Sequence, residues 1–203
     1  MKRLIYGVGI NDSDTPTMIT NKDGKQVPCP VYNKWKSMLQ RAYDKKYHIR
    51  RPTYIGATVS NEWLRFSNFS KWLVKQHEWQ NRELDKDLLV KGNKHYSKET
   101  FILVPQNINQ LLNDNKAKQG LFPTGVSYNK RVKKYVARIR IDGKLKHISY
   151  FTTANEAEIA YLIAKSDEIA RKAQPFKHTE PLLYTALIAH SCHFFDDYLR
   201  VVA

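Results

Sequence analysis

The sequence predicts an α+β protein. A helical N-terminal module with a ββα unit is followed by a three-stranded antiparallel sheet, a helix that packs on it, and a C-terminal helix. Two observations predict this class. Apolar residues recur at three- and four-residue steps in the first third of the chain, which is typical of amphipathic helices. Around position 140 apolar and charged residues alternate, as in a half-buried strand, and an alanine-rich helical pattern follows.

The net charge of the chain is strongly positive. Its 203 residues include 34 Lys and Arg against 19 Asp and Glu, a formal charge of +15. The excess is clustered, since 13 Lys and Arg but only 5 Asp and Glu lie between Lys116 and Lys172. A clustered excess predicts a polyanionic partner, because each neutralised phosphate releases counterions. A solubilising surface is the alternative.

The composition argues against a membrane protein, a secreted protein and a disulfide-rich protein. No run approaches the ~18 apolar residues of a spanning helix, and "MKRLIYGVGI" has too short an apolar stretch for a signal peptide, so no membrane partner is expected. The two cysteines, Cys29 and Cys192, are far apart and form no disulfide framework, which favours a reducing intracellular setting. No small-molecule cofactor is predicted, and the oligomeric state is left open.

The first module begins with a polar, turn-rich segment, residues 1–30, which predicts an irregular arm. Two apolar stripes at helical spacing follow, over residues 31–47 and 63–76, and predict two helices. Aromatic stripes at this spacing are typical of a core, and we interpret both in that way. The stripes consist of Tyr32, Trp35, Met38, Leu39, Ala42 and Tyr43, and of Trp63, Phe66, Phe69, Trp72 and Leu73.

A strand–loop–strand–helix order follows between Arg82 and Asp114. Leu84–Leu89 predicts a strand, "GNKHYSKE" a loop, "TFILVP" a second strand and "QNINQLLND" a helix. The polar stretch "NKAKQGLFPTG" then predicts a domain boundary near 115–121. The predicted organisation is an arm over 1–30, a module over 31–115, a second module over 116–173 and a helical extension over 174–203.

The sequence of the second module, residues 116–173, predicts three strands followed by a helix. "GVSYN", "KYVARIRI" and "KLKHISYF" predict the strands, and Asp142-Gly143 is a strong two-residue hairpin signal. Thr153 and Glu156 are spaced as a capping box, which predicts the start of a helix. A mostly small face of that helix could lie close against the sheet; it consists of Ala157, Ala160, Tyr161 and Ala164.

The central strand predicts two unlike faces. Tyr135, Ala137, Ile139 and Ile141 alternate with arginines, so the covering helix should bury the first set and leave Arg138 and Arg140 open. A sheet face with Arg, Lys and His can enter a DNA groove, where arginine can hydrogen-bond to guanine and lysine can contact phosphate. The alternative is a solvated outer face, which is common in antiparallel sheets. Lys144 and Lys146 are the candidate cations of the third strand.

This stretch resembles the APETALA-type, or ethylene-response-factor, DNA-binding domain. The resemblance rests on the opening Gly-Val, on "KYVARIR", on "ISYFTT" and on "ANEAEIAYLIA", over about fifty residues. It implies that the sheet contacts the major groove of double-stranded DNA. Ser149 and His147 depart from the family pattern, so base preference is not carried over. The contacts implied by position are Tyr128, Lys130, Arg131, Arg138, Arg140 and His147.

The segment "LDKDLLVKGNKHYSKETFILVPQNIN" resembles the HNH nuclease motif. Phage proteins that join such a segment to an APETALA-type domain are homing endonucleases, and the layout over residues 28–172 is similar to theirs. The resemblance implies a phage-encoded DNA endonuclease in the cytoplasm of a bacterial host, with Mg²⁺ held by Asp85 and Asn109. The general-base position falls on Lys86 in place of histidine, and the central asparagine aligns nearest to Thr100.

The lysine leaves the enzymatic hypothesis open. A lysine side chain is protonated at neutral pH and is therefore a poor base. His95 could supply the imidazole from the loop, or Asp87 could be the base with a rearranged set of ligands. The other alternative is a degenerate ββα scaffold in a DNA-binding regulator or architectural protein. An RNA-binding protein that stacks exposed aromatics on single strands is a third hypothesis.

Overall fold

The computed structural model describes residues 4–113 and 121–202, with the side chains of 195–200 and 202 left out. The chain divides into two compact units, Met1–Val104 and Pro105–Ala203, which we call the N-terminal and C-terminal units. The sequence placed the boundary at the linker near 115–121, of which residues 115–120 lie outside the described part. The observed division falls at the end of strand β6, so the helix after β6 belongs to the C-terminal unit.

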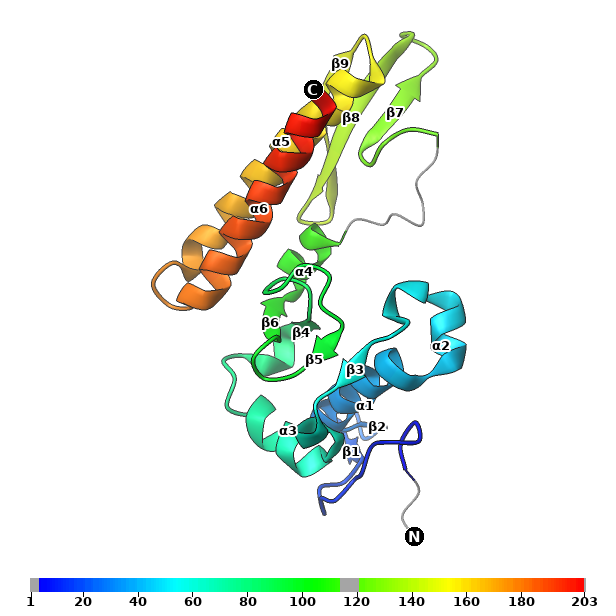
Figure 1. Ribbon diagram of the computed structural model, residues 1–203, viewed down its shortest axis with the longest axis vertical. Coiled ribbons are helices and arrows are strands. Elements are labelled where there is room, and N and C mark those ends of the chain that lie inside the picture. The colour runs from blue at the N-terminus through cyan, green and yellow to red at the C-terminus, as the bar shows by residue number, and fades with distance from the viewer. Residues whose placement is uncertain (1–3, 114–120, 203) are drawn as a thin grey trace. The chain divides into compact units, whose positions relative to one another are not determined.

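The N-terminal unit contains short strands and helices around one core. Its strands form three two-stranded pairs, β1 with β2, β3 with β5 and β4 with β6 (Figure 1). The β3–β5 pair is parallel and joins Thr58 to His95, within the segment predicted as a loop. The elements are β1 (Met18–Thr20), β2 (Gln26–Pro28), α1 (Pro30–Tyr43), α2 (Lys45–Arg50), β3 (Thr58–Val59), α3 (Phe66–Leu73), β4 (Arg82–Asp85), β5 (His95–Tyr96) and β6 (Ile102–Pro105), with 3₁₀ turns at Pro52–Tyr54, Asn61–Leu64 and Trp79–Asn81.

The N-terminal arm is not irregular throughout, which corrects the prediction for residues 1–30. Strands β1 and β2 form an antiparallel hairpin. The side chain of Asn21 accepts hydrogen bonds from the backbone N–H of Asp23 (3.1 Å) and Lys25 (2.8 Å) and so closes the turn. Each strand has only three residues, exposed on nearly every side, and therefore shows no apolar alternation that a sequence pattern could reveal.

The two aromatic stripes form the core of the N-terminal unit, as predicted. Trp35 of α1 and Trp63 are both 0% exposed, and the indole N–H of Trp35 donates to the carbonyl oxygen of Trp63 at 2.7 Å. The predicted first helix is broken at Asp44, whose side chain accepts from the N–H of Lys46 and begins α2. The second stripe lies on a 3₁₀ turn and α3, with Phe66, Phe69 and Leu73 also fully buried.

The C-terminal unit contains the predicted three-stranded antiparallel sheet, in the order β7-β8-β9. The mixed α+β class is thereby confirmed. Helix α5 packs on the sheet and α6 packs on α5, so the two helices run side by side (Figure 1). In the described part of the chain no helix is both long and apolar enough to cross a membrane. The elements are α4 (Gln106–Leu112), β7 (Val126–Asn129), β8 (Lys134–Ile141), β9 (Lys144–Phe151), α5 (Ala154–Ala173), a 3₁₀ turn (Gln174–Phe176) and α6 (Pro181–Val202).

The hairpin turn and the helix capping box that the sequence predicted for this unit are both confirmed. Asp142 and Gly143 both have positive φ, 49° and 75°, as a type I′ hairpin turn requires. The Thr153 side chain accepts from the N–H of Glu156, and the Glu156 side chain accepts from the N–H of Thr153. This reciprocal capping box starts α5 at the predicted residue and fixes where the helix leaves the sheet.

Candidate nucleic-acid interface and candidate metal site

The two faces of β8 differ in burial around the arginines, although Val136, on the same face as Arg138, is only 1% exposed, contrary to the predicted alternation. Ala137 and Ile139 are 0% and 4% exposed on the face that α5 covers. Arg138 is half-buried and Arg140 is exposed on the opposite face. We call this second surface the arginine face; its side chains come from β8 (Val136, Arg138, Arg140) and from their cross-strand partners on β9 (Leu145, His147, Tyr150).

A β-bulge in β9 decides which side chains join the arginine face. The register moves from Ala137↔Ser149 to Arg138↔His147, so Ile148 has no opposite residue. Simple alternation would put His147 and Tyr150 on opposite faces, whereas the bulge brings both onto the arginine face. Their ring centroids lie 4.7 Å apart. Tyr150 is exposed and was not among the predicted contacts, because a one-residue irregularity leaves no signal in the sequence.

Three predicted contacts lie on the other side of the sheet. Lys144 and Lys146 stand opposite Ile141 and Ile139, and directly opposed residues of an antiparallel pair share a face. Tyr128 stands opposite Tyr135, with 5.1 Å between ring centroids. The structure therefore does not bring Tyr128, Lys144 and Lys146 onto the arginine face.

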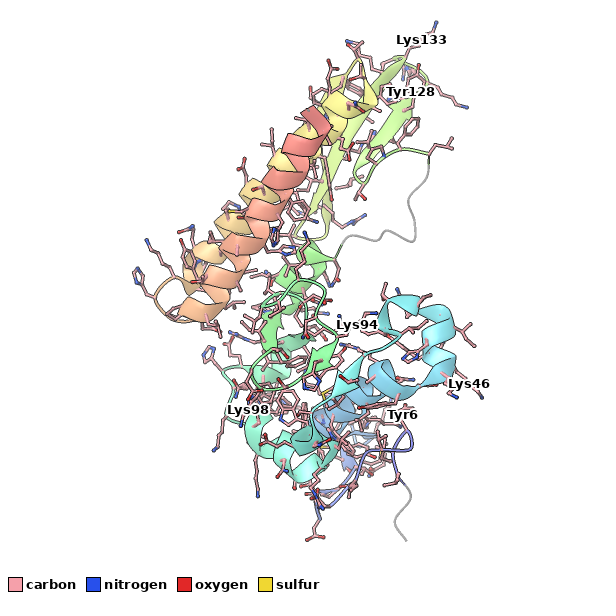
Figure 2. All side chains as sticks on the ribbon, viewed as in Figure 1. Tyr6, Lys46, Lys94, Lys98, Tyr128 and Lys133 are labelled. Atoms are coloured by element: carbon pink, nitrogen blue, oxygen red, sulfur yellow. The ribbon has the colours of Figure 1, made fainter. Side chains whose placement is uncertain are left out.

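The turn between β7 and β8 carries further cations. Lys130, Arg131 and Lys133 are all exposed there, and Lys133 lies at the tip of the turn (Figure 2). The Asn129 side chain accepts from the N–H of Arg131 at 3.0 Å and of Val132 at 3.4 Å, which shapes the turn. Lys130 and Arg131 were predicted contacts; Lys133 adds a third cation to the same turn.

Beyond Arg138, whose backbone N–H donates to the carbonyl oxygen of Gly125 at 2.8 Å, strand β8 pairs with β9 alone. Strand β7 has four residues against eight in β8, and its pairing begins at Val126↔Ala137. The segment from Arg138 to His147 is therefore a two-stranded ribbon that ends at the Asp142-Gly143 turn. A ribbon of this width can enter a DNA major groove, which is about 12 Å wide.

Asp85, the predicted metal ligand of the N-terminal unit, ends strand β4. Its Oδ1 accepts from the backbone N–H of Asp87 and of Leu88, both at 2.8 Å, and so shapes the turn after the strand. Its Oδ2 makes no hydrogen bond or ion pair with the residues that the structure describes. One carboxylate oxygen of Asp85 is therefore available to a hard divalent cation, which binds oxygen ligands.

Lys86 is used by the loop that follows β4. Its Nζ donates to both carboxylate oxygens of Asp87, at 2.6 and 2.8 Å, and to the carbonyl oxygen of Asn93 at 2.8 Å. These three acceptors match the three donors of an ammonium group. The side chain is only 11% exposed and lies 5.8 Å from the ring centre of Tyr54. Lys86 therefore closes the loop, and all three of its N–H donors are engaged there.

His95 presents an exposed imidazole from strand β5. Its Nδ1 lies 2.9 Å from the hydroxyl oxygen of Thr58, which orients the ring. The Asn93 amide donates to the carbonyl oxygens of Lys86 (3.0 Å) and His95 (2.8 Å) and thus links the two ends of the loop. Thr100, the residue nearest to the family's central asparagine, donates to the same His95 carbonyl at 2.7 Å.

Asn109, the other predicted metal ligand, lies on α4 in the C-terminal unit. Its side-chain oxygen accepts from the Asn113 amide at 3.2 Å, and its backbone carbonyl accepts from the same amide at 2.8 Å. Asp85 and Asn109 thus belong to different units. Within residues 4–113 and 121–194, no group of three or more His, Cys, Asp or Glu side chains could hold a metal ion.

Comparison of the chain with protein-family models, with curated proteins and with solved structures gives no match.

Proposed function

We propose that this protein binds double-stranded DNA through the arginine face. The observation that carries the proposal is the pairing of Arg138 with His147 on a face opposite to the one that α5 covers. Arginine can form two hydrogen bonds to the O6 and N7 atoms of guanine in the major groove. The ribbon from Arg138 to His147 places Arg138 and Arg140 on one face of one strand, two residues apart, so that they would reach neighbouring base pairs.

The cationic turn between β7 and β8 would contribute affinity for any sequence. Lys130, Arg131 and Lys133 are exposed at one end of the sheet, where side chains can meet the phosphates that border a groove. Each phosphate contact releases counterions, so binding should weaken steeply as salt rises. The two sets of cations then have different roles, sequence reading by the arginine face and phosphate contact by the turn.

Duplex DNA is favoured over single-stranded RNA by the burial of the aromatics. The two stripes that could have stacked on bases are core, with Trp35 and Trp63 fully buried. Among the described Phe, Tyr and Trp side chains, Tyr128 and Tyr150 are exposed, and they lie on opposite faces of the sheet, with the exposed His147 beside Tyr150. A surface for single strands would instead present several exposed aromatics along one track.

Equilibrium binding at several salt concentrations tests the proposal. Full-length protein would be titrated into a labelled 20-base-pair duplex selected from a random library, with unlabelled duplex DNA, single-stranded RNA and double-stranded RNA as competitors. We expect duplex DNA to compete best and log K to fall linearly with log salt, by about 0.9 for each phosphate contacted. Preferential binding of single-stranded RNA would contradict the proposal.

A second candidate function is Mg²⁺-dependent cleavage of the bound DNA. This function is favoured by the imidazole of His95, which is exposed and oriented by Thr58. The Asn93 amide bonds to the backbone of both His95 and Lys86 and so holds strand β5 next to the Lys86–Asp87 turn. A histidine is neutral in a large fraction of molecules near pH 7 and can take a proton from an attacking water. Lys86 is then a structural cation of the loop, and His95 replaces it as the candidate base; Asp87 is engaged by Lys86.

The residues present fit a magnesium ion in part. Asp85 offers one carboxylate oxygen, and a single protein ligand leaves room for waters and phosphate. The resemblance also names Asn109 of the C-terminal unit, whose side-chain oxygen already accepts from the Asn113 amide. When bound, Mg²⁺ would neutralise charge on the scissile phosphate and on the leaving oxygen. The alternative function is that of a DNA-binding regulator that keeps this loop as a scaffold.

A nicking assay on supercoiled plasmid and phage DNA separates these functions. We expect Mg²⁺-dependent nicking that falls at least about 100-fold in His95→Ala, the range typical of a lost general base. A similar loss is expected in Asp85→Asn, because the carboxylate charge that would bind the cation is removed. Asp85→Asn keeps an acceptor for the Asp87 and Leu88 N–H groups, so that it tests the charge and not the turn. His178→Ala, which removes an exposed imidazole from the C-terminal unit, is the control.

Two results would contradict the enzymatic proposal. Nicking by His95→Ala at the rate of the unaltered protein would exclude His95 as the base. No nicking by the unaltered protein with either Mg²⁺ or Mn²⁺, on DNA that it demonstrably binds, would favour the regulator.

A further inference from the structure

The C-terminal unit contains a hollow of about 550 Å³ beside the ribbon. Its walls come from one side of α4, from the Arg138–Gly143 segment with Leu145, and from α5. Thr124 and Gly125, which directly precede β7, also line the hollow, and the Gly125 carbonyl oxygen accepts from the backbone N–H of Arg138 at 2.8 Å. Helix α4 and the two arginines thus border the same space.

Helix α4 exposes amides and carries no charge. Its sequence, "QNINQLL", is anchored by Ile108 and Leu111, which are 2% and 7% exposed. Asn109 is occupied by the Asn113 amide at the end of the helix. Asn107 and Gln110 are exposed, lie three residues apart on one side of the helix, and line the hollow. Neither amide makes a hydrogen bond with the described residues.

The opposite wall is cationic, because its acids are already paired. Lys172 donates to Asp142 Oδ1 at 2.5 Å, and this bond lowers the pKa of Asp142. Arg171 donates to both carboxylate oxygens of Glu168. Arg138 and Arg140 are the charged residues of β8 that line the hollow, and one guanidinium nitrogen of Arg140 donates to the carbonyl oxygen of Gly143 at 2.7 Å. DNA held by these arginines would meet no unpaired carboxylate among the lining residues, because Asp142 and Glu168 are both paired.

We infer that Asn107 and Gln110 read base edges beside the base pairs that Arg138 and Arg140 contact, with a preference for adenine. The inference rests on the proposed duplex binding. Asparagine and glutamine amides pair with the N6 and N7 atoms of adenine, as arginine pairs with guanine. An uncharged amide adds little attraction to phosphate, so these residues should set selectivity and not overall affinity.

Selection from a random duplex library tests the inference. The unaltered protein should select sites with adenine at one or two positions next to the guanines that depend on Arg138 and Arg140. The double variant N107A/Q110A should lose about tenfold or more of that adenine preference at each position. Its affinity for unrelated duplex DNA should stay within about twofold, since no charge is removed. Gln106→Ala is the matched control, because Gln106 is an exposed amide of α4 that does not line the hollow.

The outcomes separate the inference from the function on which it rests. The double variant R138A/R140A would be passed through the same selection, and circular dichroism would check that each variant is folded. If R138A/R140A selects the same sites with the same affinity, the proposed function is wrong. If R138A/R140A loses binding while N107A/Q110A keeps every preference, or if the unaltered protein selects no adenine, only the reading by α4 is wrong.

Discussion

Replacing Arg138 and Arg140 together by alanine should weaken binding to a selected duplex by about 100-fold or more at fixed salt. Each bidentate contact between arginine and guanine contributes about 1–3 kcal/mol of discrimination, and about 1.4 kcal/mol is a factor of ten in affinity. The effect should be largest for the selected sequence and much smaller for unrelated duplexes. Fluorescence anisotropy with both duplexes at one salt concentration would measure it.

The sheet itself provides a matched control for that experiment. The variant K144A/K146A also removes two cations, but from residues opposite Ile141 and Ile139 on the face that α5 covers. We expect less than a tenfold loss, similar for selected and unrelated duplexes, because only general attraction to phosphate is reduced. Equal losses in the two double variants would show that charge alone determines binding and would contradict docking by the arginine face.

Replacing Gly125 by alanine should strongly destabilise the C-terminal unit. Gly125 has φ +80°, which costs other residues about 1–2 kcal/mol. A Cβ atom there would lie 2.1 Å from Cδ2 of Tyr161, a buried ring of α5. Strain and displacement of the ring together should lower stability by about 3 kcal/mol or more, which is about 10 °C or more in Tm for a unit of this size. Thermal unfolding followed by far-UV circular dichroism would measure it.

Gly143→Ala isolates the strain from the steric clash. Gly143 has φ +75°, but a Cβ atom there would meet nothing within 4 Å. Its cost should therefore be only about 1–2 kcal/mol. All four tryptophans lie in the N-terminal unit, so their fluorescence should report an unchanged transition in both variants. Equal destabilisation by the two substitutions would contradict the close packing of Tyr161 on Gly125.

The position of Lys86 bears on whether the loop is active. A resemblance by position assigns the role of base to this lysine, yet its ammonium already donates to Asp87 and to the Asn93 carbonyl. Removing the cation would leave the Asp87 carboxylate without its partner and release the loop. A loss of nicking in a Lys86 variant would consequently reflect the shape of the loop, whereas a loss in His95→Ala, with the fold intact, would reflect the chemistry.

The sequence by itself determined the features that depend on neighbours along the chain. The capping box at Thr153, the turn at Asp142-Gly143 and the two aromatic stripes follow from periodicity and from short-range hydrogen bonds. The alternation of β8 likewise separated Arg138 and Arg140 from the buried Ala137 and Ile139. These signals are local, so they are readable before any tertiary contact is known.

Only the tertiary structure decided the features that depend on register or on distant partners. The bulge at Ile148 reassigns the residues on each side of it, because a shift of one residue exchanges the faces of a strand. The oriented ring of His95 needs Thr58, 37 positions away in the chain, and the use of Lys86 needs Asn93. Residues of α4 and of the ribbon line one hollow although more than 25 positions of the chain separate them. No local pattern encodes contacts of this kind, since each depends on how separate segments pack together.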